Sequence, residues 1–429
     1  MNYVFFFLVF SAFGFTAWRQ IYWDKGSHEQ SPMHLLGLGM VETAGSAVTL
    51  AIGLIGVMAL FLGLMKIAEK AGLLGVFAKL LRPLMVRLFP EIPQNHPAMG
   101  AMIMNLSANA LGLGNAATPF GIRAMQELNK LNPLKGTATD PMILFLAINT
   151  SSVTLLPTGI IALRAAAGSN DPAGILPTTL FATLLSTTVA IVSAKMLAKW
   201  NRPKLRYAER PEGLPENSGE PEKAEDLSGD GYPAWVSALA LISLIALIPM
   251  TVIFGTSIAP WIIPSLMLGF LSYGMIKKVP IYESFVEGAE EGFKVAVRII
   301  PYLIAILVAV GMLRSSGALD IFVGWVGYYT NSLGLPGDAL PMALLRPLSG
   351  SGAYGIVAAT INDPNIGPDS YTGYLVSTLQ GSTETTFYVL AVYFGAVQIK
   401  RLRYALVVAL TADAAGIAGA IIACSYIFG

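Results

Sequence analysis

Long, nearly uninterrupted runs of apolar residues constrain the fold of this chain more than any other feature. Several approach the roughly 20 residues that cross a bilayer as a helix. They cover residues 4–18, 47–65, 142–163, 176–194, 235–254, 258–275, 299–312 and 404–427. Only 12% of the residues are charged, against about 25% in soluble domains. The sequence therefore predicts an all-α polytopic membrane protein and disfavours a soluble helical domain.

Charge, cysteine content and motifs exclude several other classes. The formal net charge is +1, which provides no electrostatic basis for binding nucleic acid. The single cysteine, Cys424, excludes an intrachain disulfide and a metal site built from several cysteines. H-E-x-x-H, G-x-S-x-G and P-loop motifs do not occur, so we expect no enzyme activity and no resident cofactor. No basic residue precedes the run at 4–18, which predicts an uncleaved membrane segment.

One stretch of the second half concentrates polar side chains. Residues 379–387 read L-Q-G-S-T-E-T-T-F, and apolar sequence follows directly. Glu384 would be costly in such surroundings unless it were solvated or paired. It is either a group that binds substrate or a coupling ion, or the partner of an arginine that joins two helices. Neighbouring donors and acceptors favour the first interpretation and predict a substrate-binding hairpin. They belong to Gln380, Ser382, Thr383, Thr385 and Thr386.

The two halves of the chain repeat each other. Four blocks of similar sequence recur in the same order: 41–48 with 286–293, 71–77 with 316–322, 105–111 with 347–353, and 149–156 with 380–387. We therefore predict a first repeat at 1–199, which includes the N-terminal membrane segment, and a second at 233–429. The polar segment at 200–232, in which Pro and Gly recur, reads as a flexible linker.

The distribution of Lys and Arg predicts that the repeats are inverted. Five cations follow the first core span of half one, between Lys66 and Arg87, whereas half two has only Arg314 before Arg346. Since cytoplasmic loops are enriched in Lys and Arg, the two halves enter the membrane from opposite sides and the linker is cytoplasmic. Two spans, at 235–254 and 258–275, would return the chain to the cytoplasm.

Other polar residues in apolar stretches complete the candidate site. The counterpart of the Glu384 stretch, N-T-S-S-V-T-L-L at 149–156, has no charge, and helix packing alone is its alternative role. Arg346 could pair with Glu384, bind an anionic group of the substrate, or lie in an interfacial loop. The predicted substrate-binding set is Gln380, Ser382, Thr383, Glu384, Thr385, Asn149, Ser151, Ser152, Asn105, Asn109, Ser349, Ser351 and Arg346.

Acidic residues elsewhere suggest an ion site and an interface. Asp413, inside the final apolar run, is either a helix-to-helix hydrogen-bonding group or a proton site. With Glu384 and Thr385 it suggests a cation site, and Na⁺ or H⁺ as a coupling ion. Glu42 and Glu287 are equivalent in the repeat, and we expect both on interfacial helices that could support a homodimer.

The motifs resemble a known group of membrane proteins. N-L-S-A-N-A-L-G-L-G-N-A-A-T-P-F-G, N-T-S-S-V-T-L-L-P-T and A-L-R-A-A-A-G resemble the spore maturation A family. L-R-P-L-S-G-S-G-A, G-P-D-S and Q-G-S-T-E-T-T-F-Y-V-L-A-V-Y-F-G resemble the spore maturation B family, so the two look fused. Both belong to the nucleoside recognition, or Gate, superfamily, which is similar to the concentrative nucleoside transporters and to the membrane domain of ferrous-iron transporter B. The resemblance implies base contacts from Gln380, Thr383 and Glu384.

These observations lead to two functional expectations. The first is an integral membrane secondary transporter of a small polar or anionic solute, nucleoside-like and ion-coupled, in the bacterial plasma (inner) membrane. Its partners would be the solute, the lipid bilayer and a second copy of the chain. The alternative is a non-transporting membrane scaffold or signalling protein in envelope or spore maturation, whose polar clusters would pack without a cavity.

Overall fold

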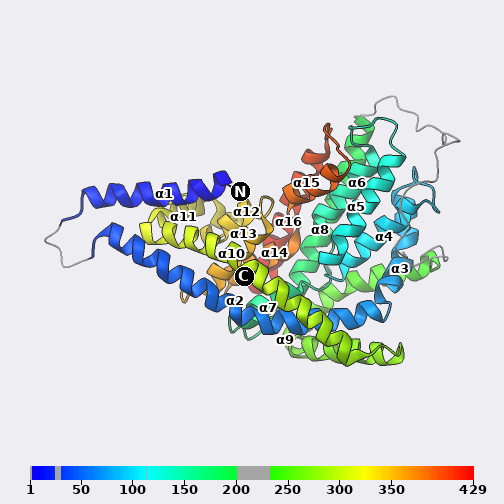
Figure 1. The fold of residues 1–429 in the computed structure, drawn as a ribbon, viewed down its shortest axis with the longest axis horizontal. Helices are drawn as coiled ribbons and strands as arrows, with labels where there is room; N and C mark the ends of the chain where they lie inside the picture. Colours follow the sequence, from blue (N-terminus) through cyan, green and yellow to red (C-terminus); the bar gives the residue numbers. More distant parts are fainter. Residues whose placement is uncertain (1, 25–29, 113, 201–231) are drawn as a thin grey trace.

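A computed structural model describes residues 2–24, 30–112, 114–200 and 232–429. Within these ranges the chain is helical and contains no strand, as the apolar runs predicted (Figure 1). The predicted linker at 200–232 lies almost entirely outside the described residues.

The helices of the first half range from 9 residues in α7 to 39 in α2. They are α1 (Asn2–Ile21), α2 (Pro32–Lys70), α3 (Leu73–Leu88), α4 (Pro97–Ala110), α5 (Gly114–Lys130), α6 (Asp140–Ser151), α7 (Thr158–Ala166) and α8 (Leu176–Trp200). The second half contains α9 (Ala234–Ile276), α10 (Ile281–Ser316), α11 (Ala318–Thr330), α12 (Leu340–Leu345), α13 (Gly350–Ile361), α14 (Tyr371–Ser382), α15 (Thr386–Ala396) and α16 (Ala405–Phe428), with two 3₁₀ turns, Asn331–Leu333 and Gly337–Ala339, before α12. Taken in chain order, the helices α10 to α16 correspond one to one with α2 to α8. The inverted relation between the halves stays a prediction.

Two long helices, α2 and α10, pack side by side and antiparallel (Figure 1). Their backbones approach closely at glycines: a Cβ on Gly292 would lie 2.7 Å from the Cα of Ala59. Lys66 pairs with Glu291 at 3.3 Å, and Lys70 pairs with Glu287. Glu42 and Glu287 each lie within one of these two long, continuous helices, and their interfacial placement stays a prediction.

The two spans predicted at 235–254 and 258–275 both lie in α9, which is helical from Ala234 to Ile276. Both ends of α9 lie beside the turn between α2 and α3: Ser237 Oγ donates to Leu80 O at 2.7 Å, and a Cβ on Gly274 would lie 2.6 Å from Ile67 Cγ2. A straight helix would separate residues 237 and 274 by about 55 Å, so α9 bends back on itself. The chain therefore returns to the side where α9 begins, and the crossing of a membrane by its two arms stays a prediction.

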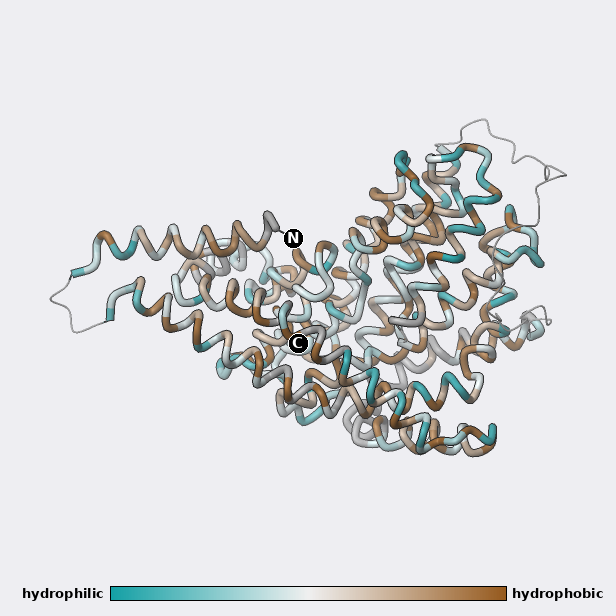
Figure 2. The backbone as a smooth tube through the Cα atoms, in the orientation of Figure 1, coloured by the Kyte–Doolittle hydropathy of each residue, from teal (hydrophilic) through white to brown (hydrophobic). Residues whose placement is uncertain are grey.

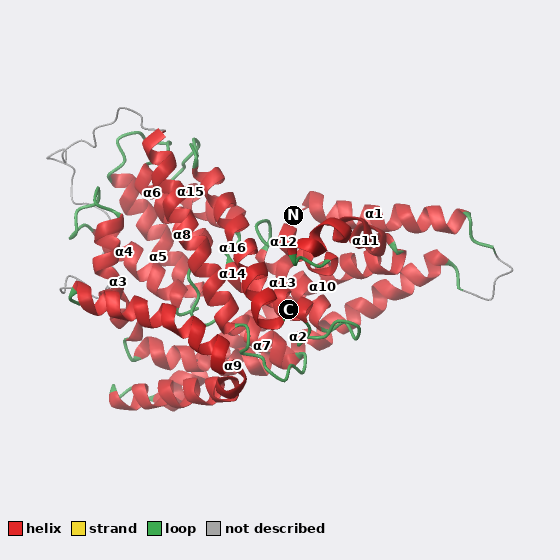
Figure 3. Cartoon of the chain, turned by 180° about the vertical axis from the view of Figure 1, so that it is seen from behind, coloured by secondary structure: helices red, strands yellow, loops and turns green. Residues whose placement is uncertain are grey.

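The candidate site lies in a bundle centred on α8 and α16, which are antiparallel. Ser186 Oγ donates to Ala412 O at 2.7 Å, and a Cβ on Gly419 would touch Ala182. α6 packs along α16 and α14 packs along α8, and Figures 1 and 3 both show α8, α14 and α16 side by side. The two halves are therefore interleaved.

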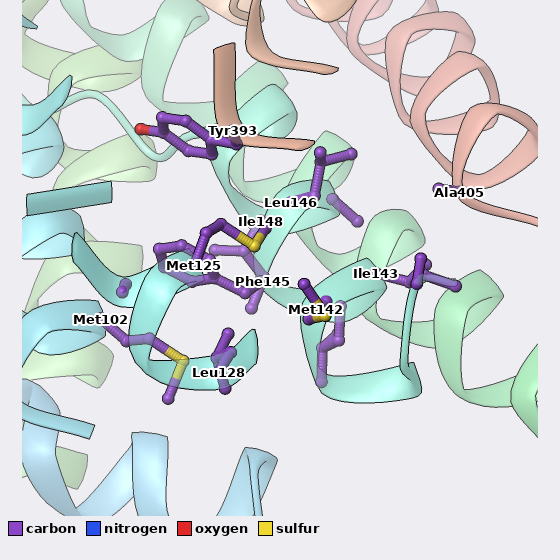
Figure 4. Packing of buried hydrophobic residues seen from close by; sticks show 14 of the residues in the cluster. Met102, Met125, Leu128, Met142, Ile143, Phe145, Leu146, Ile148, Tyr393 and Ala405 are labelled. Carbon is purple, nitrogen blue, oxygen red and sulfur yellow. The ribbon is translucent and has the colours of Figure 1, made fainter. Parts of the chain in front are cut away.

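The core of this bundle combines apolar residues from both halves. Figure 4 shows methionine, leucine and isoleucine side chains of α4, α5 and α6 around Phe145. The Phe145 ring stacks on Tyr393 of α15 at 6.1 Å between centroids. Burial of these side chains holds the second half against the first.

The outer surface is strongly apolar in several places. Large side chains are exposed on α1 and α11, among them Phe6 (64%), Trp325 (70%) and Tyr328 (79%). Figure 2 shows hydrophobic residues along much of the helices, with hydrophilic ones at loops and at some helix turns. By length and composition, α8 and α16 are the two helices of the described residues that could cross a membrane. Exposed apolar area of this kind marks an interaction with a membrane or a partner.

Candidate functional site

The two polar stretches singled out in the sequence are interruptions of helices. Residues 152–157 separate α6 from α7 and are called the first break. Residues 383–385 separate α14 from α15 and are called the second break. Thr383 is extended, with φ −146° and ψ 165°, and Pro157 precedes α7. Hydroxyl side chains compete with helical hydrogen bonding, and proline cannot continue it, so helices end at such sequences.

Each interrupted helix continues to the far end of the bundle. α6 begins where Tyr404, beside the start of α16, donates to Asp140 at 2.7 Å. α7 ends where Arg164 donates to Pro368 O at 2.6 Å, just before α14 begins. The hairpin predicted around Glu384 is therefore a break in a helix that crosses the bundle.

Two other segments form the hairpins, and their tips reach the breaks. α4 and α5 turn at Gly112, which has φ +77°, and Leu155 N of the first break donates to Ala110 O at 3.0 Å. α12 and α13 turn at residues 346–349, and Phe387 N beside the second break donates to Pro347 O at 3.2 Å. The repeated blocks N-L-S-A-N and P-L-S-G-S lie on these hairpins.

The C-terminal ends of α6 and α14 meet in the middle of the bundle. Glu384 N, after α14, donates to Thr150 O in the last turn of α6 at 2.8 Å. Thr187 of α8 donates to Ser151 O at 3.0 Å. Because helix C-termini carry partial negative charge, their meeting favours cations or hydrogen-bond donors nearby.

Arg346 supplies a cation at the second break. This residue is 5% exposed and comes from the α12–α13 turn. Its Nε donates to Gln380 O at 3.1 Å, its Nη1 to Thr385 Oγ1 at 3.0 Å, and its Nη2 to Thr383 O. The guanidinium thus satisfies carbonyls that the end of α14 leaves open, which is the usual role of a cation at a helix C-terminus.

Glu384 is the charged group that the second break presents outward. Its side chain is 51% exposed, and its Oε2 lies 3.9 Å from Arg346 Nη2. The distance gives electrostatic attraction without a direct hydrogen bond. Glu384 is therefore placed beside a buried cation, and its carboxylate is half-exposed.

Asp413 lies on α16 behind the same break. Thr386, the first residue of α15, donates to Asp413 Oδ2 at 2.7 Å, and Asp413 is 3% exposed. Thr385 Oγ1 accepts a hydrogen bond from Arg346, and the cation site expected near Glu384, Thr385 and Asp413 stays a prediction. The described residues contain no group of three or more His, Cys, Asp or Glu that could hold a metal ion.

Neutral side chains form a hydrogen-bond network at the first break. Asn109 Nδ2 donates to Asn149 Oδ1 at 2.9 Å, and Tyr393 Oη donates to the same oxygen at 3.3 Å. Asn105 Nδ2 donates to Tyr393 Oη at 3.1 Å and to Ala117 O at 2.7 Å. The structure therefore brings the three predicted asparagines together through a tyrosine of the other half.

Most of the predicted hydroxyl residues serve the backbone locally. Ser151 and Ser382 are buried and donate to carbonyls in their own helices. Ser349 caps α13 by accepting from Gly352 N at 3.0 Å, and Thr154 donates to Ser152 O at 3.2 Å. Gln380 lies beside the second break, and its buried Oε1 has no hydrogen-bond partner among the described residues. Ser351 is half-buried in the first turn of α13.

Sequence reasoning missed a buried network that fastens the halves together. Arg164 is fully buried, donates to Asp369 Oδ1 and Ser169 Oγ at 3.1 Å each, and lies 4.1 Å from the Tyr374 ring centroid. The motifs A-L-R-A-A-A-G and G-P-D-S were quoted for resemblance, and the spatial pairing of their Arg and Asp went unpredicted. Tyr393 was also missed, because it sits in an apolar run.

Comparisons with known proteins agree with this two-part architecture. The nucleoside recognition (Gate) family model matches residues 51–167 and 296–400, one segment in each half. The chain therefore belongs to the nucleoside recognition family. Family membership and the two membrane-length helices agree on a membrane-associated protein.

Two relatives match different parts of the chain, as in a fusion. Spore maturation protein B of Bacillus subtilis (strain 168) is 50% identical over 167 residues, which are 39% of this chain and 93% of that protein. Spore maturation protein A of the same organism is 50% identical over 149 residues, 35% of this chain and 76% of that protein. No solved structure matches the chain.

Proposed function

We propose that this chain is a secondary transporter of a small polar, nucleoside-like solute, which binds at the meeting point of the two helix breaks. The observation that carries the proposal is the half-exposed carboxylate of Glu384, held beside the buried guanidinium of Arg346 where α6 and α14 end. Interrupted helices that expose backbone ends and polar side chains in the middle of an apolar bundle are typical of transporters.

The arrangement of the halves supports alternating access. α8 and α16 occupy corresponding places in the two halves and run antiparallel, as an inverted repeat requires. We propose repeats at 1–199 and 233–429, several membrane crossings in the bacterial plasma (inner) membrane, and the 200–232 linker on the cytoplasmic side. The excess of cations after the first half's spans supports that side for the linker.

The contacts of Arg346 favour neutral over anionic solutes. Three of its nitrogens donate to atoms of the second break, so its hydrogen-bonding capacity is largely used. The charge left open to a ligand is the carboxylate of Glu384, which accepts hydrogen bonds and repels anions. A nucleoside base offers N–H donors without negative charge and fits this chemistry better than a nucleotide.

Ligand-dependent thermal unfolding of the purified protein tests the proposal, because a ligand that binds the native state raises its Tm. We expect uridine, adenosine or guanosine to raise the Tm, and UMP to have a much smaller effect. Glu384→Gln should abolish the shift, whereas Glu290→Gln, the same change at an exposed position of α10, should retain it. A panel without any nucleoside effect would favour the scaffold alternative, and an equal shift in Glu384→Gln would exclude the assigned site.

A further inference from the structure

A buried carboxyl group lies directly behind the α14–α15 break without a full set of partners. Thr386 Oγ1 donates to Asp413 Oδ2 at 2.7 Å. The other oxygen, Oδ1, is buried and has no hydrogen-bond partner within the described part of the chain. Asp413 itself is 3% exposed, so water does not solvate it freely.

The ionisable groups around Asp413 leave it without a committed counter-ion. Arg346 is the nearby cation, and its nitrogens are bonded to Gln380 O, Thr383 O and Thr385 Oγ1. The helices packed on α16 (α6, α8, α14 and α15) contribute the following other ionisable groups: Asp140, Lys195, Lys199, Tyr371, Tyr374, Tyr388 and Tyr393, with Glu384 in the break. Asp140 is bonded to Arg403 and Tyr404 at the far end of α6, and the lysines lie near the C-terminal end of α8.

Charge balance favours a neutral Asp413 in this state. Arg346 and Glu384 together already carry one positive and one negative charge at the break. An ionised Asp413 would add a second negative charge with one neutral donor, and burying such a carboxylate is far more costly than burying a carboxyl. The first half has no equivalent of Asp413, because α8, which corresponds to α16, contains no acidic residue.

We propose that Asp413 is a proton-binding site whose ionisation releases Arg346 from the end of α14. Loss of the proton from the Asp413 carboxyl to water reaching the break would leave a carboxylate. The Arg346 Nη2 hydrogen bond to Thr383 O would then break, and a hydrogen bond from Nη2 to Asp413 would form. The carbonyl of Thr383 would lose its donor, so the break that positions Glu384 would rearrange.

This inference rests on the proposed function for its consequence, which is that solute movement is coupled to protons. The proton-binding step itself needs no solute. Its failure and the failure of the transport proposal can therefore be distinguished by measurements on the ligand-free protein.

Infrared spectroscopy of the full-length protein in phospholipid vesicles tests the charge state. At neutral pH we expect a C=O band from a protonated carboxyl, which Asp413→Asn removes and Glu384→Gln retains. Thr386→Val, which deletes the donor to Oδ2, should shift the band without removing it. A spectrum that Asp413→Asn leaves unchanged would overturn the proposal, because Asp413 would then be ionised.

Hydrogen exchange of the peptide that spans residues 379–387 tests the release of Arg346. After correction for intrinsic exchange rates, we expect several-fold faster exchange in the wild-type protein as pH rises, because ionisation frees the end of α14. Asp413→Asn imitates the protonated group, and its exchange should stay slow at every pH. The same pH dependence in both proteins would overturn the coupling, whether or not any nucleoside binds.

Discussion

Each of the two helix breaks is a short non-helical segment between two helices, but different side chains form the hydrogen bonds around each break. At the first, between α6 and α7, neutral amides and the Tyr393 phenol bond to one another. At the second, between α14 and α15, a buried guanidinium bonds to the end of α14 and leaves the Glu384 carboxylate half-exposed. The two breaks thus occupy corresponding places in the two halves, whereas the charged groups lie at the second break, where Glu384 stands opposite Val153 in the sequence blocks.

The largest effect is expected from removing the cation of the second break. Arg346→Met leaves the carbonyls of Gln380 and Thr383 without their donor and Glu384 without its neighbouring charge. We expect a loss of about 3–5 kcal/mol of unfolding free energy, typical of breaking a buried charged network. Unfolding in denaturant measures it, with Arg346→Lys as the control that keeps the charge and part of the bonding. Wild-type stability in Arg346→Met would show that the two breaks do not differ in this way.

A smaller effect is expected from crowding the first break. A Cβ on Gly121 would lie 2.2 Å from Tyr393 Oη, so Gly121→Ala must displace the phenol that joins Asn105 to Asn149. Overpacking of this kind costs about 1–3 kcal/mol. Gly100→Ala is the matched control, because a Cβ there meets nothing within 4 Å. Thermal unfolding that ranks the two variants equally would argue against a packed phenol.

The smallest effect is expected from removing a single hydroxyl. Tyr393→Phe keeps the stacking on Phe145 and loses the bonds to Asn105 and Asn149. We expect a loss of about 1 kcal/mol, since one neutral hydrogen bond contributes modestly. Tyr388→Phe, at a side chain that is 56% exposed, should change stability very little. A loss from Tyr393→Phe as large as that from Arg346→Met would contradict the distinction between a neutral and a charged break.

Sequence reasoning predicted the all-helical fold and missed how the polar stretches are arranged in space. Apolar runs predict helices because length and hydrophobicity are local properties, and the repeated blocks paired two stretches that both interrupt helices in the structure. The polar sequences alone fit either the tip of a hairpin or a break in a helix that crosses the bundle. The packing of the helices that follow Pro157 and Thr385 decides between the two, and the sequence does not show that packing. Tyr393 reached the first break through long-range packing, and nothing in its apolar neighbourhood marks it. Arg346 was singled out, but its bonds to the end of α14 depend on tertiary structure.

Uptake of radiolabelled uridine into vesicles that contain the purified protein tests the central claim most directly. Glu384→Gln keeps the size of the side chain and removes the charge that the second break presents. We expect wild-type protein and Glu290→Gln to take up uridine at similar rates, and Glu384→Gln to lose uptake while its Tm without ligand stays close to wild type. Uptake by Glu384→Gln at the wild-type rate would contradict the assignment of the site to the α14–α15 break.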